Sequence, residues 1–326
     1  MKLRQLQYVN EVAGNGFSIT AAAGALFTSQ PGISTQIRRL EDELGVKLFE
    51  RSGKHLTGLT PTGSVIIQHV ERILREVENI EDIAAERRDP ARGSLTIATT
   101  HTQARYVLPE IVKTFRQRYP RVALHLHQGT PTQIAQMTAS GKADLGIATE
   151  ALELFSDLVL LPCYRWNRCV IVPQGHPLAD GAPLTLERVA DFPVITYVFG
   201  VADRSEINRA FEDRALTPQV VLTAADAEVV KTYVRTGLGV GIIARMAYEA
   251  ERDQDLAAID AGHLFDASVT SLAIRDNAHL RGFAYDFIQL FAPHLTRSVV
   301  SRLVQTKDKR MHQGLFNRYV ARTELR

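Results

Sequence analysis

The chain has 326 residues, 45% hydrophobic content, 23% charged content and a formal net charge of +2. A chain of this length can form two or three domains with cores of their own. The mean hydropathy of -0.08 excludes a disordered chain, and the lack of an apolar run of about 20 residues excludes a membrane-spanning protein. The N-terminus lacks the apolar segment of a secretory signal, so we expect a cytoplasmic protein with no membrane partner.

The distribution of charge matters more than its near-neutral total. Residues 1–60 carry +2, residues 61–92 carry -2 and the tail from Arg297 carries +6, which leaves -4 for the middle of the chain. A mildly basic head of this kind remains compatible with nucleic-acid binding. The two cysteines, Cys163 and Cys169, fit a reducing compartment and cannot form a zinc site unaided, so we expect plain thiols and no metal.

The first 60 residues predict three short helices followed by a small basic hairpin. The helices are expected at residues 3–14, 18–26 and 30–44. Ser18 and Ser29 are the expected N-caps of the later two, and Gly45 ends the third. Two short extended pieces between residues 46 and 57 then form the hairpin. This order is typical of a winged helix-turn-helix, whose second motif helix enters the major groove of DNA.

Candidate DNA contacts lie at the start of the third helix and on the hairpin. We expect the following side chains to face DNA: Ser29, Gln30, Ser34, Thr35, Arg38, Arg51 and Lys54. Gln can pair with adenine, hydroxyls suit a base edge or a phosphate, and Arg binds guanine or phosphate. The hairpin residues would contact the DNA backbone. The alternative is an ordinary three-helix bundle with solvated polar residues, and spacing alone does not separate the two.

Residues 61–91 predict one long linker helix with a heptad seam. Its apolar residues recur at alternating spacings of four and three: Ile66, Val70, Ile73, Val77 and Ile80. Such a helix would be about 45 Å long, and a partner helix from a second chain is its natural cover. We therefore predict dimerisation through this seam. The alternative is a long amphipathic helix that lies on its own core.

From residue 92 the periodicity alternates between strand and helix. Strands are expected at 95–99, 122–127, 143–148, 219–223 and 270–274, and helices at 106–118, 131–140, 204–214 and 227–236. This alternation predicts a parallel sheet, and it is interrupted at about residues 158–173. We expect an effector domain over residues 92–296 made of two α/β lobes joined by crossing strands. The first lobe is placed at about 92–162 plus 268–296, and the second at about 163–267.

The basic tail, residues 297–326, is a separate segment in this division of the chain. It would dock on a neighbouring subunit, contact DNA phosphates or form a frayed end.

Polar residues follow the first strand of the effector domain, where ligands bind in sheets of this kind. Thr100, Thr102 and Gln103 lie there, and Thr149 follows another strand. Hydroxyls and amides suit a small oxyanion or an amino-acid-like carboxylate, although they could instead cap a helix. Trp166, the only tryptophan, lines the cleft or packs in the core. No catalytic triad or metal-ligand set stands out, so we expect neither an enzyme nor a resident cofactor.

The head resembles that of the LysR-type transcriptional regulators. The matching stretches are TSQPGISTQI at 28–37, LEDELGVKLFER at 40–51 and TPTG at 60–63. The resemblance implies a winged helix-turn-helix, a dimerising linker helix, a two-lobed effector domain like that of periplasmic binding proteins, and a tetramer. Gln30, Pro31 and Ser34 match the family's DNA-contacting pattern, whereas Thr35 stands where many members have Arg or Lys.

The effector domain resembles the CysB-like branch of that family, which regulates sulfur assimilation. The matching stretches are THTQARY at 100–106, YRWNR at 164–168 and KTYVRTGLGVG at 231–241. The resemblance implies O-acetylserine or N-acetylserine as effector, with sulfate and thiosulfate as opposing anions. It also implies that Thr100, Thr102, Gln103 and Thr149 contact the effector. Ala202 stands where the branch commonly has a pocket threonine, and a lost hydrogen bond to a charged ligand costs about 1.5 to 3 kcal/mol.

Together these observations predict a homo-oligomeric transcription regulator of sulfur-assimilation and cysteine-biosynthesis genes. Its expected partners are double-stranded promoter DNA and a second copy of itself, with RNA polymerase as a further candidate. Effector binding would close the two lobes and change the geometry of the oligomer on DNA. Two alternatives stay open at this point: the same architecture sensing another small anion or a sulfonate, and an enzyme or solute-binding protein built on the α/β lobes.

Overall fold

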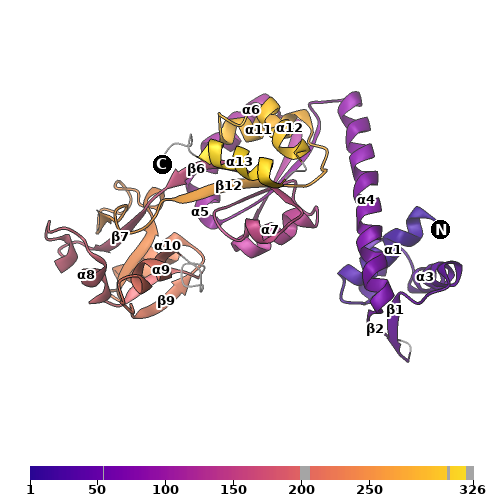
Figure 1. Cartoon of the computed structure of the whole chain (residues 1–326), viewed down its shortest axis with the longest axis horizontal. Coiled ribbons are helices and arrows are strands. Elements are labelled where there is room, and N and C mark those ends of the chain that lie inside the picture. Colours follow the sequence, from indigo (N-terminus) through magenta and orange to yellow (C-terminus); the bar gives the residue numbers. More distant parts are fainter. Residues whose placement is uncertain (54, 199–205, 307–308, 321–326) are drawn as a thin grey trace. The chain divides into compact units, whose positions relative to one another are not determined.

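The computed structural model describes residues 1–53, 55–198, 206–306 and 309–320. The chain forms two compact units, Met1–Arg87 and Arg88–Arg326, and each is described by itself (Figure 1). Within the described ranges, no helix is both long enough and apolar enough to cross a membrane.

The first unit begins with three helices and a two-stranded hairpin. These are α1 (Leu3–Gly14), α2 (Ile19–Ala25), α3 (Gln30–Leu44), β1 (Phe49–Ser52) and β2 (His55–Leu59). The predicted caps are confirmed: the Ser18 hydroxyl accepts a hydrogen bond from Ala21 N and that of Ser29 from Gly32 N. Gly45 ends α3 in the left-handed conformation, with a φ of 70°. Val12, Ile33, Ile37 and Leu40 lie at the centre of the core of this unit.

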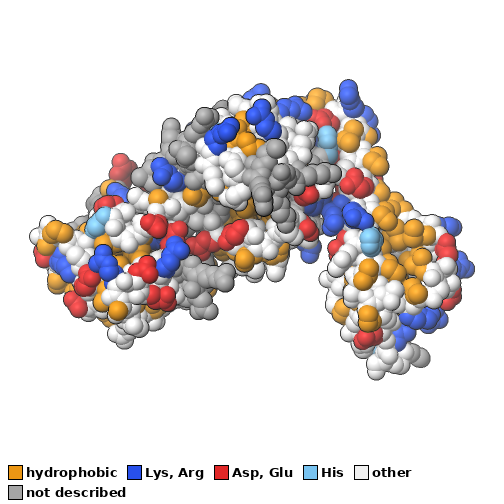
Figure 2. Space-filling view, in the orientation of Figure 1, with side chains coloured by type: hydrophobic (Ala, Val, Ile, Leu, Met, Phe, Trp, Pro, Cys, Tyr) orange, Lys and Arg blue, Asp and Glu red, His pale blue; other side chains and the backbone are white. Residues whose placement is uncertain are grey.

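Helix α4 (Pro61–Arg88) follows, and part of its predicted seam is used within the chain. Val70 is only 2% exposed and, with partly buried Ile66, packs against the core of the head. The assignment of Val70 to a contact with a second chain is therefore wrong, and the alternative of a helix packing on its own core holds for this end of α4. Farther along, Ile73 and Ile80 are 40% and 65% exposed. Figure 2 shows such apolar side chains along α4.

The second unit contains two five-stranded sheets. The first has the order β4-β3-β5-β12-β6 and the second the order β11-β7-β10-β8-β9. The strands of the first are β3 (Gly93–Thr99), β4 (Val122–Gln128), β5 (Leu145–Ala148), β6 (Leu158–Trp166) and β12 (Ser268–Arg275). Those of the second are β7 (Arg168–Pro173), β8 (Val194–Tyr197), β9 (Val220–Ala224), β10 (Val240–Ala244) and β11 (Leu256–Asp260).

Both sheets are mixed, so the predicted parallel pairing holds for only part of each sheet. In the first, β3 pairs in parallel with β4 and β5, but β12 runs antiparallel to β5 and β6. In the second, β7 is antiparallel to β10 and β11. The antiparallel strands are those that cross between the lobes, since β6 leads directly into β7 through Asn167. The interruption seen at about residues 158–173 is this crossing, and β6 extends past the lobe limit expected at residue 162.

Helices flank the two sheets (Figure 1). They are α5 (His101–Tyr106), α6 (Leu108–Arg118), α7 (Pro131–Ala139), α8 (Leu186–Ala190), α9 (Glu206–Glu212), α10 (Ala227–Arg235) and α11 (Gly282–Phe291). Short 3-10 turns lie at Leu152–Leu154, Pro177–Ala179 and Arg245–Ala247. The helix predicted at 106–118 is observed as α6, which begins at Leu108, and the short helix α5 precedes it, with Val107 between them. The break has a local cause, because Pro109 lacks the N–H that a continuous helix would need at that position.

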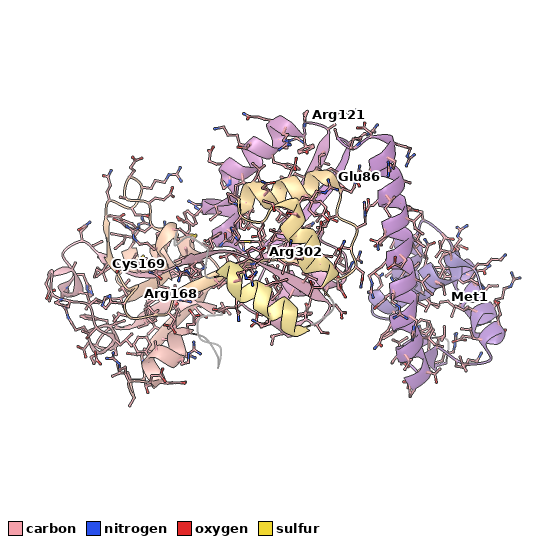
Figure 3. The ribbon with its side chains drawn as sticks, turned by 45° about the horizontal axis from the view of Figure 1, so that its top comes forward. Met1, Glu86, Arg121, Arg168, Cys169 and Arg302 are labelled. Carbon is pink, nitrogen blue, oxygen red and sulfur yellow. The ribbon has the colours of Figure 1, made fainter. Side chains whose placement is uncertain are left out.

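The C-terminal segment packs on the first lobe of its own chain. Helix α12 (Arg297–Gln305) buries Val300 and Leu303 in the same core as the sheets, and α13 (Lys309–Val320) contacts β6. Tyr319 stacks on His294, whose Nε2 is 2.8 Å from the Pro162 carbonyl oxygen. Figure 3 labels Arg302 on α12. The described part of the tail is thus an element of the fold, and not the frayed end considered above.

Candidate nucleic-acid interface and ligand pocket

The predicted DNA contacts gather around the first turns of α3. The Ser29 hydroxyl caps this helix, and Pro31 lies in its first turn. The Gln30 side chain donates from Nε2 to the Thr20 hydroxyl at 2.7 Å, which orients it against α2 and leaves its carbonyl oxygen available. Thr35 and Arg38 are exposed and Ser34 is half-buried. The polar ends of these side chains are therefore accessible to DNA at the solvent-exposed side of α3.

A groove runs between α3 and the hairpin. It is lined by Ser34, Arg38, Glu41, Asp42, Lys47, Arg51 and Gly53. Arg51 takes part in an ion pair with Glu41, with 3.3 Å between Nη2 and Oε2, so its guanidinium is held against the groove wall. Lys54, the other predicted hairpin contact, lies outside the described residues. The DNA contacts themselves stay predictions, but Ser34, Arg38 and Arg51 line the same groove.

Glu41 is a residue of this surface that the sequence analysis missed. Its side chain is fully buried, and its Oε1 accepts hydrogen bonds from the backbone N–H groups of Leu48 at 2.9 Å and Phe49 at 3.4 Å. Its Oε2 pairs with Lys47 and Arg51. One carboxylate therefore fixes the start of the hairpin to the end of α3. The sequence signal was an acidic residue on a face of α3 that is otherwise apolar, flanked by Ile37 and Leu40.

The second unit contains a pocket between its two lobes. The cavity is lined by Thr100, Thr102, Gln103, Pro131, Thr149, Glu150, Trp166, Tyr197, Ala244 and Met246. The described residues named as candidate effector contacts thus line a single cavity. Ala202, the remaining candidate, lies outside the described residues. The pocket lies at the carboxyl ends of parallel strands from both sheets, as expected for this type of fold.

A hydrogen-bond network holds the first-lobe side of the pocket. Gln103 donates from Nε2 to the Thr270 hydroxyl at 3.3 Å and accepts from the Tyr164 hydroxyl. The Thr149 hydroxyl lies 3.4 Å from that of Thr270 and accepts from Trp166 Nε1 at 3.2 Å. Gln103 is therefore a supporting residue as much as a ligand contact, because both ends of its amide already have partners. Thr270 and Tyr164, buried partners in this network, were not predicted.

Contacts across the pocket join the lobes. The Tyr197 hydroxyl is hydrogen-bonded to Thr102 of the first lobe, and burial raises its pKa to about 12. The Ala244 N–H donates to the same hydroxyl at 3.3 Å. Nearby, Arg105 and Tyr106 of α5 both contact the Glu228 carboxylate of α10. Tyr197 was not predicted, although its place at the end of β8 is the same kind of position that identified Thr100 and Thr149.

Among the described residues that line this pocket, Glu150 is the acidic one. Burial raises the pKa of its carboxyl to about 6, opposed by the positive charge of Arg168 and reinforced by Glu206 and Glu153. The two cysteines are free and buried, and burial raises the pKa of the Cys169 thiol to about 12. In the described part of the chain, no group of His, Cys, Asp or Glu side chains could hold a metal ion.

Two family profiles match the chain. The profile described as LysR substrate binding domain covers residues 88–296. The profile described as bacterial regulatory helix-turn-helix protein, lysR family, covers residues 3–64. They coincide with the α/β unit and with the helical head, respectively.

Relatives match nearly the whole length of the chain. The chain is 49% identical over 316 residues to the HTH-type transcriptional regulator CysB of Haemophilus influenzae, covering 97% of this chain and 98% of that one. It is 48% identical over 305 residues to the HTH-type transcriptional regulator SsuR of Burkholderia cenocepacia, covering 94% and 99%. The cofactor-binding domain of the Cbl transcriptional regulator matches with 42% identity and a TM-score of 0.63, covering 66% of this chain and 95% of that structure. These relatives are regulators, which leaves the enzyme alternative without support.

Proposed function

This chain belongs to the LysR family of transcriptional regulators, and we propose that it binds promoter DNA through α3 and the hairpin under the control of a small sulfur-metabolism effector. The genes it serves would be those of sulfur assimilation and cysteine biosynthesis. The observation that supports this most is the inter-lobe pocket, because side chains chosen from the sequence as effector contacts line one cavity.

The pocket's chemistry suits a small polar metabolite. Thr100, Thr102 and Thr149 line a cavity that Pro131 and Met246 also line, so a ligand there meets both polar and apolar side chains. O-acetylserine and N-acetylserine have this character, and sulfate or thiosulfate would meet the polar side chains alone. The same architecture sensing a sulfonate or another small anion is the alternative.

The contacts between the lobes suggest how binding is transmitted. A ligand that touches Thr102 and Tyr197 together favours the arrangement in which the lobes are close, since these two residues come from opposite sides of the cleft. The ligand can shift the equilibrium between the open and closed arrangements of the lobes only to the extent that it binds one arrangement more tightly than the other. Lobe closure would then change the geometry of the oligomer and its contacts with DNA. RNA polymerase is a candidate partner at the promoter.

Self-association is proposed through the exposed half of α4. Ile73, Val77 and Ile80 recur on one side of the helix, and Ile73 and Ile80 are exposed in the single chain. Replacing Ile80 with Glu should lower the fraction of dimer in sedimentation experiments, because a charge would enter the apolar seam. Gln68→Glu adds the same charge at an exposed polar position and should leave the dimer intact. Equal dimerisation of both variants would contradict this arrangement.

Calorimetric titration of the full chain tests the effector assignment. We expect heat from at least one of O-acetylserine, N-acetylserine, sulfate and thiosulfate, and a Thr149→Val variant should bind the same compound more weakly. No heat from any of the four, together with heat from a sulfonate or an unrelated anion, would replace the sulfur-metabolite proposal by its alternative.

A further inference from the structure

The linker turn, residues 89–92, connects α4 to β3 and belongs to the second unit. Inside it, Asp89 Oδ1 accepts a hydrogen bond from the Ala91 N–H at 3.2 Å, and the Asp89 carbonyl oxygen accepts one from the Arg92 N–H at 3.3 Å. The head and α4 precede the turn, and the two sheets that hold the pocket follow it. The turn is therefore the covalent path through which a change in the second unit reaches α4 of the same chain.

Arg281 binds both ends of the linker turn. Its Nη2 donates to the Asp89 carbonyl oxygen at 3.1 Å and to the Arg92 carbonyl oxygen at 2.8 Å. Arg281 is only 8% exposed, and its guanidinium carbon lies 4.8 Å from the centroid of the Phe283 ring. A buried cation is costly unless it is hydrogen-bonded, and the turn supplies acceptors. Displacing the turn would leave the guanidinium with fewer partners, so the turn and Arg281 hold each other in place.

Two further residues support this contact. Gly93, the first residue of β3, lies so close to Arg281 that an added Cβ atom would overlap the guanidinium and lie 3.1 Å from the Phe283 ring. At the surface, Arg121 forms an ion pair with the Asp89 carboxylate, with 2.8 Å between Nη1 and Oδ2 and 3.1 Å between Nη2 and Oδ1 (Figure 3). Arg121 is largely exposed, so this pair contributes less than the buried contacts. We call Arg281, Arg121 and the turn that they bind the linker clamp.

Arg281 follows a strand that crosses between the lobes. Strand β12 carries Thr270, whose hydroxyl accepts a hydrogen bond from Nε2 of the pocket residue Gln103 at 3.3 Å. Residues 276–280 then lead to Arg281, the N-cap of α11. Helix α11 is fixed on the first lobe, since Asp286 pairs with Arg118 of α6 at 2.9 Å. One short stretch of chain therefore extends from a pocket contact to the linker clamp, and side-chain contacts hold both of its ends.

From this arrangement we infer that Arg281 is a positioning residue that couples the second unit to α4. It holds the linker turn in one path, so that a rearrangement of the lobes moves α4 instead of being lost in a loose connection. Arg281 lines neither the ligand pocket nor the groove beside α3. Its loss should therefore leave both binding reactions intact and reduce the influence of one on the other. The inference rests on the proposed function, because it needs a chain whose DNA affinity responds to an effector.

The coupling is measured as the ratio of the dissociation constants for DNA with and without effector. Labelled promoter DNA from a sulfur-assimilation operon is titrated with the full chain, with and without whichever of O-acetylserine, N-acetylserine, sulfate and thiosulfate gives calorimetric heat. Coupling between two sites is typically about 5- to 150-fold, and Arg281→Met should bring the ratio to less than about twofold. Met keeps an unbranched side chain beside Phe283 and lacks the hydrogen-bond donors. The affinities of this variant for the compound, and for DNA without it, should stay close to those of the unmodified chain.

Two other variants complete the comparison. Arg297→Met removes an exposed arginine of the same lobe that lies over the Tyr285 ring, also at 4.8 Å, and should leave the ratio unchanged. Asp89→Asn removes the charge that pairs with Arg121 but keeps the carbonyl oxygen that Arg281 binds. It should lower the ratio in the same direction as Arg281→Met and by less.

A purely structural role of Arg281 would weaken both binding reactions together and keep the ratio. An unchanged ratio in the Arg281→Met variant therefore overturns the coupling role and leaves the proposed function standing. If this variant binds neither the compound nor DNA, Asp89→Asn decides the question, and an unchanged ratio there has the same meaning. An unmodified chain whose DNA affinity is the same with and without all four compounds overturns the proposed function and the coupling role together.

Discussion

The indole Nε1 of Trp166 donates a hydrogen bond to the Thr149 hydroxyl across 3.2 Å. Trp166 is the last residue of β6, immediately before the chain crosses to the second lobe. The Arg168 guanidinium lies over its ring, with 4.9 Å between the guanidinium carbon and the ring centroid. Thr149, in contrast, lies on the pocket wall. This hydrogen bond links the ligand pocket to the crossing strand, so a ligand that draws the Thr149 hydroxyl toward itself also changes the surroundings of Trp166.

Effector binding is therefore expected to change tryptophan fluorescence. Trp166 is the only tryptophan of the chain, and its indole lines the pocket. Titration with a compound that binds in calorimetry should shift or quench the emission along the same binding curve. A Trp166→Phe variant, which lacks tryptophan, gives the background emission for this titration. A compound that binds with full heat but leaves the emission of the unmodified chain unchanged would contradict binding beside Trp166.

Arg38 is expected to contribute directly to DNA affinity. It is exposed on α3 and lines the groove beside the hairpin, so Arg38→Ala should weaken binding to a sulfur-assimilation promoter by about 1–3 kcal/mol. A phosphate contact would also make the salt dependence shallower. Arg39→Ala removes the neighbouring exposed arginine, which does not line the groove. Fluorescence anisotropy with labelled promoter DNA should show a larger loss for Arg38→Ala, and equal losses would argue against a specific role.

Glu41 is expected to stabilise the hairpin. Replacing it with Gln removes the buried charge that accepts from Leu48 N and pairs with Arg51. A loss of about 1.5 to 3 kcal/mol of local stability corresponds to amide hydrogen exchange about 10- to 100-fold faster at Leu48 and Phe49. Glu50→Gln changes an exposed carboxylate on β1 and serves as the control. Unchanged exchange in the Glu41→Gln variant would show that the carboxylate does not hold this junction.

Ligand affinity should depend on pH through Glu150. Burial, with the nearby Glu206 and Glu153, raises the pKa of its carboxyl to about 6 against the opposing charge of Arg168. The group is thus mainly protonated at pH 5 and mainly ionised at pH 7. Sulfate affinity should therefore fall over this interval, because an ionised carboxylate in the pocket lining repels an anion. Calorimetry at pH 5, 6 and 7 checks the direction, and the Glu150→Gln variant should flatten the profile. A profile that persists in this variant would assign the titration to another group.

Much of the fold follows from local sequence signals. Ser18, Ser29 and Gly45 mark helix ends by their own chemistry, and they act there as caps in the structure. The strand-helix alternation predicts most elements of both lobes for a similar reason, since each depends on a short stretch of chain. The crossing strands were predicted, but the lobe limit was placed at residue 162 instead of Asn167, because the antiparallel pairing of β12 with β6 that keeps β6 in the first sheet joins residues far apart in the sequence.

The candidate site residues also divide into those marked by local sequence signals and those whose roles depend on contacts between distant parts of the chain. Thr100 and Thr149 could be found because they follow recognisable strands. The position of Glu41 on the apolar face of α3 was a usable signal, but its role was not, since that role depends on hydrogen bonds from Leu48 and Phe49 that form only when the hairpin folds back on α3. Val70 shows the converse: its heptad spacing is real, but the head of the same chain covers it.

A gel-shift titration with the full chain tests the central claim most directly. Promoter DNA from a sulfur-assimilation operon is titrated with protein at moderate salt, with and without O-acetylserine, for the unmodified chain and for Thr149→Val. The account predicts a specific complex whose affinity or mobility changes with the effector, and a variant that binds DNA but responds only at higher effector concentration. A chain that forms no specific complex, or whose complex is unaffected by an effector bound in the pocket, would contradict it.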